Sequence, residues 1–144
     1  MRRAGLIALL LCLASATLAQ TIPPGVGFGV MPEARAQIDS MARATLVTRT
    51  EQARCVTTSM MRDSTFVIAV TSPAKHIAKS DSLHVYADGP LCEPWQQIIH
   101  THFVDNPWFE IASPIDYQTA ATRGVFGFLV SVKSDTTWTM RAYP

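Results

Sequence analysis

Apolar and weakly polar residues recur every three or four positions over residues 33–49, with charged residues between them. The first set is Ile38, Met41, Ala42, Thr45 and Leu46, and the charged set is Arg35, Asp39 and Arg43. This spacing is typical of an amphipathic helix, which buries one face and exposes the other. We therefore expect a helix over residues 33–49 that packs one face against a sheet.

Segments rich in Val, Ile, Thr and aromatic residues predict the strands of that sheet. Two antiparallel hairpins are expected, the first from residues 53–61 and 65–71 and the second from residues 125–133 and 136–143. Polar turn residues join the strands of each pair, because Arg62-Asp63-Ser64 separates the first two and Ser134-Asp135 the last two. Each hairpin should present its apolar positions to the same core.

A further strand is predicted between the two hairpins. Residues 95–104 are centred on Ile98 and Ile99 and have the composition of a strand. Residues 72–94 contain three prolines and many polar residues, so we expect mostly a long connection around a short strand at 83–86. His76 and His84 lie in this connection and are expected to be surface residues.

The second helix has a distinct start signal in Ser113-Pro114-Ile115-Asp116. Serine is a good N-cap, proline suits the first helical position, and an acid three residues on stabilises the free amides. The helix should end near Gly124. Together the elements predict an α/β fold in a single domain over residues 33–144, preceded by an extended leader at residues 20–32.

The first 19 residues have the layout of a secretory signal peptide. Arg2 and Arg3 precede an apolar run that is shorter than the ~20 residues a membrane-spanning helix needs. Small residues follow, and cleavage is expected after Ala16 or Ala19. We therefore expect a secreted or periplasmic protein with no membrane attachment after cleavage.

Charge and cysteine usage narrow the classes of partner and compartment. The chain has 12 Lys and Arg against 11 Asp and Glu, and loss of the leader leaves the two signs nearly balanced, with no basic run. Nucleic acid is therefore not expected as a partner. Cys55 and Cys92 remain in a chain bound for an oxidising compartment, and they form either a disulfide or two separate buried apolar side chains.

The candidate chemistry lies in His100 and His102. Residues two apart on a strand point to the same face, so both imidazoles can reach one metal ion. Catalytic zinc commonly takes three protein ligands and a water, and Asp116 in the next helix is the best-placed third ligand, with Asp105 as its nearest rival. Alternatively, the histidines are ordinary strand residues and Ser113 to Asp116 is only a helix cap.

Glu51, His100-Thr101-His102 and Ser113-x-x-Asp116 stand in the order of the JAMM motif of MPN-domain metallopeptidases. The chain resembles that family from about residue 33 to 143. The resemblance implies an MPN-like domain, with a curved, mostly antiparallel sheet flanked by helices. It implies one zinc ion per chain, held by His100, His102 and Asp116.

The resemblance also implies roles for the remaining two motif residues. Glu51 would be the general base that takes a proton from the attacking water. Ser113 would donate a hydrogen bond to the oxygen that gains charge, although its hydroxyl is equally suited to cap the helix. The implied function is a zinc metallopeptidase or isopeptidase that hydrolyses an amide bond of a peptide or protein. The alternatives are a non-catalytic MPN-like binding module and a small secreted structural domain without metal.

Two features depart from the family pattern. The family usually has proline directly after the second histidine, where this chain has Phe103. The stretch before the serine is also longer than usual, so residues 103–112 must bulge if Asp116 is to reach a metal. Trp108 and Phe109 at the tip of this loop either shape a substrate cleft or pack against the core.

Overall fold

The computed structural model describes residues 28–61, 66–124, 126–134 and 137–144. The expected signal peptide, the first part of the leader and the turn residues Arg62-Asp63-Ser64 and Asp135 lie outside these ranges. Within them, no helix is both long enough and apolar enough to cross a membrane.

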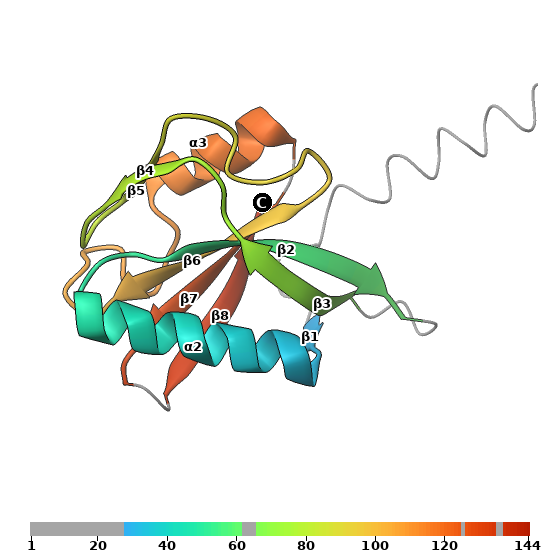
Figure 1. The fold of residues 1–144 in the computed structure, drawn as a ribbon, viewed down its shortest axis with the longest axis horizontal. Helices are drawn as coiled ribbons and strands as arrows, with labels where there is room; N and C mark the ends of the chain where they lie inside the picture. Colours follow the sequence, from blue (N-terminus) through green and yellow to red (C-terminus); the bar gives the residue numbers. More distant parts are fainter. Residues whose placement is uncertain (1–27, 62–65, 125, 135–136) are drawn as a thin grey trace, which may run out of the picture.

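Six strands form one curled, mixed sheet in the order β1-β3-β2-β6-β7-β8 (Figure 1). Their bounds are β1 Phe28–Val30, β2 Ala53–Met60, β3 Phe66–Pro73, β6 Gln97–Phe103, β7 Gly127–Val132 and β8 Trp138–Tyr143. Strand β2 pairs antiparallel with β3 and β6, as does β7 with β8, whereas β1 is parallel to β3 and β6 is parallel to β7. The α/β prediction is confirmed, and the sheet contains two parallel pairs.

Helix α2 (Pro32–Thr48) runs along one side of the sheet, and helix α3 (Pro114–Arg123) lies on the other side (Figure 1). The main core lies under α2, where Ile38 and Met41 pack with Ile99, Phe128 and other buried residues of the sheet. A smaller cluster lies on the α3 side. Central strands β6 and β7 are buried along almost their whole length because both faces are covered.

The alternation of side chains along β6 decides which residues meet which helix. Ile99 packs into the core beneath α2, and the Thr101 hydroxyl lies 2.6 Å from that of Thr45 on the same helix. Since neighbouring side chains point to opposite faces, His100 and His102 face α3. The predicted strand therefore places both histidines on one face, on the side away from the main core.

Two segments differ from the sequence-based expectation. Part of the expected leader is strand β1, which pairs with β3, and the Met31 amide donates to the carbonyl of Ile68. The long connection contains a small hairpin of β4 (Ile77–Ser80) and β5 (Val85–Ala87), where only one strand was expected. Both are short strands that form through pairing with distant or neighbouring segments, and short runs carry little periodic signal of their own.

Cys55 and Cys92 form a disulfide, which settles the alternatives left open by their spacing. The bridge joins β2 to the connection before β6, and both residues are buried beside Ile98. Leu91, the neighbour of Cys92, packs against the same cluster. The disulfide therefore ties this part of the connection to the face of the sheet that carries the histidines.

Removal of this disulfide in Cys55→Ala/Cys92→Ala is expected to lower the free energy of unfolding by about 2–4 kcal/mol. The bridge closes a loop with a sequence separation of 37 residues, which restricts the unfolded chain. Urea unfolding of the oxidised protein and the variant measures the difference. Reduced wild-type protein should behave like the variant, and equal midpoints for all three samples would contradict the expectation.

Candidate metal centre

Four predicted site residues converge on one buried point. Glu51 precedes β2, His100 and His102 lie on β6, and Asp116 lies in the first turn of α3. Glu51, His100 and His102 are 3 %, 4 % and 1 % exposed. Three segments that are far apart in the sequence thus contribute to one polar cluster in the interior.

The distances within the cluster are short. The Nε2 atoms of His100 and His102 are 3.2 Å apart. Asp116 Oδ1 lies 3.3 Å from Nε2 of His100, and Asp116 Oδ2 lies 3.6 Å from Nε2 of His102. Glu51 Oε1 lies 3.3 Å from Nε2 of His102. Both imidazoles therefore direct Nε2 at the carboxylates and at each other.

Backbone hydrogen bonds around Thr101 bring Glu51 to this point. The Thr101 amide donates to the carbonyl of Gln52 at 2.9 Å, and the Gln52 amide donates to the Thr101 hydroxyl at 2.8 Å. Thr101 stands between the two histidines, so these bonds fix the segment before β2 beside them. The Glu51 amide also donates to the carbonyl of Asp81. Glu51 is thereby held by strand pairing and by the neighbouring connection.

The helix cap of α3 positions Asp116. The Ser113 amide and the Ser113 hydroxyl each donate to Asp116 Oδ2 at 2.7 Å, and the Asp116 amide bonds back to the Ser113 hydroxyl at 3.4 Å. This is a capping box, and Gly124 closes the helix at the other end with a φ of 64°. The predicted helix start is confirmed. Ser113 acts as the cap here, and its proposed catalytic role stays a prediction.

The rival ligand Asp105 lies elsewhere. Its side chain is exposed and stands 3.8 Å from the Arg49 guanidinium. Asp116 is the aspartate that meets the histidines, because the loop after β6 folds back and lets α3 approach the sheet. The Ser131 hydroxyl donates to the carbonyl of Phe109 at 2.6 Å, which fixes this loop to β7.

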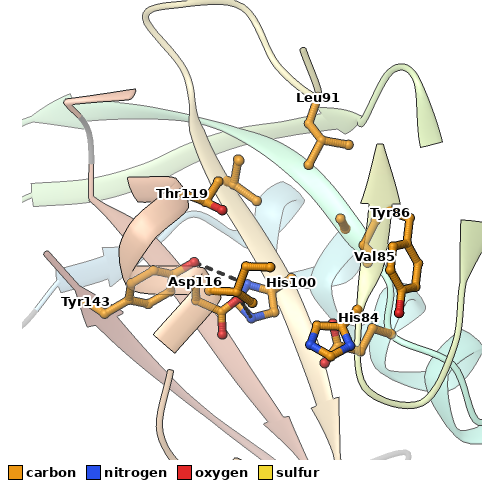
Figure 2. A pocket seen from close by; sticks show the side chains of 12 residues that line it. His84, Val85, Tyr86, Leu91, His100, Asp116, Thr119 and Tyr143 are labelled. Atoms are coloured by element: carbon orange, nitrogen blue, oxygen red, sulfur yellow. Dashed lines mark hydrogen bonds and ion pairs between the residues drawn. The ribbon is translucent and has the colours of Figure 1, made fainter. Parts of the chain in front are cut away.

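Contacts outside the cluster orient both imidazoles. Nδ1 of His102 donates to the backbone carbonyl of Trp108 at 2.5 Å, so in the neutral imidazole Nε2 is the nitrogen that can bind a metal. Nδ1 of His100 lies 3.3 Å from the hydroxyl of Tyr143 (Figure 2). A side chain at Gly127 would collide with the Tyr143 ring. Glycine at this position therefore gives Tyr143 room to reach His100.

Sequence reasoning missed three participants in the centre. The Asn106 side-chain amide donates to Glu51 Oε1 at 2.9 Å, and Asn106 is 4 % exposed. Tyr143 and the Trp108 carbonyl contact the outer nitrogens of the histidines. None of these has a spacing signal, since an amide in a loop and a tyrosine in a last strand are common. Trp108 itself is 40 % exposed and contributes through its backbone.

The two carboxyl groups differ strongly in acidity. Burial raises the pKa of Glu51 to about 9, and the negative charge of Asp116 adds to this shift. Burial also acts to raise the pKa of Asp116, but hydrogen bonds with His100 and His102 outweigh it and hold that pKa well below its usual range. Without a metal ion, Glu51 therefore keeps its proton at neutral pH while Asp116 is ionised.

Free energy of unfolding of the metal-free protein is expected to fall as pH rises from about 4.5 to about 9. Over this range the folded state keeps the Glu51 proton while the unfolded chain releases it, so rising pH favours unfolding. One proton gives a slope of at most about 1.4 kcal/mol per pH unit. Urea unfolding in the presence of a chelator measures it. Glu51→Gln should flatten the slope, and identical slopes for the two proteins would contradict this account.

The centre has the composition of a metal site. The ligand atoms of Glu51, His100 and His102 all lie within 4.8 Å of one another, so this buried group could hold a metal ion. Asp116 adds a second carboxylate next to the histidines. Imidazole and carboxylate donors suit zinc, and the orientation of His102 by a backbone carbonyl is typical of metal-binding histidines. The residues present therefore fit a zinc ion.

No model of a known protein family matches the chain, and no curated protein matches it. Inferences about function therefore come from the geometry of the centre. The resemblance to the JAMM motif stays a prediction.

Proposed function

We propose that the protein is a zinc-dependent hydrolase of amide bonds, of the JAMM type and with an MPN-like fold. The observation that carries the proposal is the convergence of Glu51, His100, His102 and Asp116 at one buried point. The four residues come from three segments, in the order that the motif requires. A purely structural role offers no reason to place a buried and a half-buried carboxyl group against two buried histidines, because burial of ionisable groups costs free energy.

In this proposal His100, His102 and Asp116 hold the zinc ion and a water completes its coordination. Asp116 is suited to the role because it is ionised, and its Oδ1 faces His100 while Oδ2 is anchored by the cap. When bound, zinc would lower the pKa of a water towards ~7 and polarise the substrate carbonyl. The two imidazoles are oriented for binding by Trp108 and Tyr143.

Glu51 is the proposed general base. Its carboxyl lies beside His102 and is held by Asn106. Burial raises its pKa to about 9 without a metal, and a nearby divalent cation would lower that pKa by favouring the ionised form. The ionised group can then accept a proton from the attacking water and pass it to the leaving amine. A carboxylate in a buried site is a stronger base than one in water, which suits this role.

The disulfide supports the proposed compartment. Disulfides persist in oxidising environments and are rare in the cytosol. The Cys55–Cys92 bridge is therefore consistent with a protein that is secreted or periplasmic. In such a compartment the substrate is a peptide or protein that is itself exported or extracellular.

Metal content and hydrolysis together test the proposal. The protein from residue 20 onward is refolded with zinc and passed through gel filtration, and its zinc is counted by elemental mass spectrometry. About one zinc per chain, with cleavage of members of a peptide library, is the expected result. Zinc without cleavage would favour the non-catalytic binding module. No zinc would contradict the proposal and favour the structural domain.

A further inference from the structure

A pocket of about 120 Å³ opens directly beside the metal centre. It lies between helix α3 and strand β5, and Figure 2 shows Leu91 well away from His100 and Asp116, with Thr119 between them. Glu51 and His100 are themselves part of its lining. A group in this pocket would therefore lie next to the atoms that carry the proposed chemistry.

The walls of the pocket combine aliphatic side chains with aromatic and polar ones, which include His84, Tyr86 and Tyr143. The aliphatic residues are Ala53, Val85, Leu91, Ile98 and Ile115, supplied by two strands of the main sheet, by β5, by the connection and by α3. Among the described residues that line it, none is a lysine or an arginine. Its acidic lining residues are Glu51 and Asp116, which lie beside His100. Val85, Leu91 and Ile98 thus offer aliphatic contact, while His84 and Tyr86 add polar atoms to the lining.

Leu91 is held in this wall by the fold. It packs in the cluster of Cys55, Cys92 and Ile98, and the disulfide ties its neighbour Cys92 to β2. Ile115, at the start of α3, is 51 % exposed although it lines the pocket. An exposed isoleucine beside a catalytic centre is one that a bound substrate can cover.

We infer that this pocket receives an aliphatic side chain, of the size of Val, Leu or Ile, from the substrate residue next to the cleaved amide. Pockets for whole small molecules are typically several times larger, about 300–1,000 Å³. A cavity of about 150 Å³ holds a benzene-sized group, so this one fits a single side chain. An acidic side chain is disfavoured by Glu51 and Asp116, and a glycine would leave the aliphatic walls in contact with water. The placement of this pocket next to the cleaved amide rests on the proposed function.

The pocket is tested first without metal, so that the result does not depend on catalysis. N-acetyl-leucinamide is titrated into the metal-free protein in chelator, and amide shifts are followed by NMR, with N-acetylglycinamide as the matched ligand. Shifts at Leu91, Ile98 and Thr119 with the leucine compound alone are expected. Equal effects of the two compounds, or no effect of the leucine compound at these residues, would overturn the inference.

Thr119→Phe should fill the pocket and abolish these shifts. Thr119 lines the pocket from an exposed position on α3, so the larger ring does not enter the core. Gln118→Phe is the matched control, because Gln118 is exposed on the same helix and is not part of the lining. Urea midpoints confirm that both variants fold. Loss of the shifts in both variants, or in neither, would count against the assigned pocket.

The zinc-loaded protein then tests the position of the pocket relative to the centre. Calorimetry compares the hydroxamates of N-acetylleucine and N-acetylglycine, whose hydroxamate group binds zinc. The leucine compound is expected to bind at least about tenfold more tightly, and Thr119→Phe should remove that ratio. Equal affinities in the wild type would overturn the inference. If neither hydroxamate binds, the proposed zinc site is contradicted. The metal-free titration then still shows whether the pocket binds an aliphatic side chain.

Discussion

Glu51→Gln is expected to reduce amide hydrolysis by about 10²–10⁴-fold while the protein keeps its zinc. Glutamine has nearly the same size, and its amide oxygen can still accept the hydrogen bond that Asn106 donates to Glu51. It cannot take a proton from water, so the general base alone is lost. The measurement is kcat on the best peptide of a library screen, with zinc counted on the same sample.

Glu110→Gln is the matched control for this variant. Glu110 is exposed and stands 3.7 Å from Lys133, away from the centre, so its substitution should change neither activity nor zinc. Full activity in Glu51→Gln would remove Glu51 from the mechanism. Loss of zinc in that variant would instead indicate that Glu51 is a metal ligand. The geometry also permits this role, because the ligand atoms of Glu51, His100 and His102 lie within 4.8 Å of one another.

Asp116→Asn is expected to weaken zinc affinity by more than about 100-fold. Loss of an outer-shell partner typically costs 10–100-fold, and a direct ligand should cost more. Asparagine retains an oxygen that can accept from the Ser113 amide, so the start of α3 should survive. Competition with a chromogenic chelator measures the dissociation constant.

Two further variants separate the metal from the helix cap. Asp116→Ala removes the cap acceptor as well and should lose zinc and about 0.5–2 kcal/mol of stability. Asp105→Ala removes the exposed rival and should leave zinc affinity unchanged, because Asp105 contacts Arg49 and not the centre. Unchanged zinc affinity in Asp116→Asn would favour a ligand set of Glu51, His100 and His102.

The same hydrogen bonds stabilise the helix and build the site. Asp116 Oδ2 completes the capping box with Ser113, and that contact leaves Oδ1 facing His100. A helix start that is recognisable from four residues therefore delivers a carboxylate to the histidines at a fixed angle. One side chain can therefore complete the helix cap and also serve as the proposed metal ligand, since a carboxylate has two oxygens.

Local sequence patterns were sufficient to predict much of the fold. Helix α2 begins and ends within a residue of its predicted span, and α3 begins at the predicted cap and ends at Gly124. The period of two along β6 put His100 and His102 on one face before any partner was known. These features depend on hydrogen bonds and spacings within a few residues, and such local interactions can be predicted from the residue types alone.

Only the tertiary structure decided the features that join distant segments. The parallel pairing of β6 with β7, strand β1 and the Cys55–Cys92 bridge depend on which segments meet in space. The choice of Asp116 over Asp105, and the presence of Asn106 and Tyr143, follow from the path of the loop after β6. The sequence by itself determined the helices, most strands and the order of the candidate residues. The shape of the centre and of the pocket beside it comes from packing between segments, and such non-local contacts leave no periodic trace in the sequence.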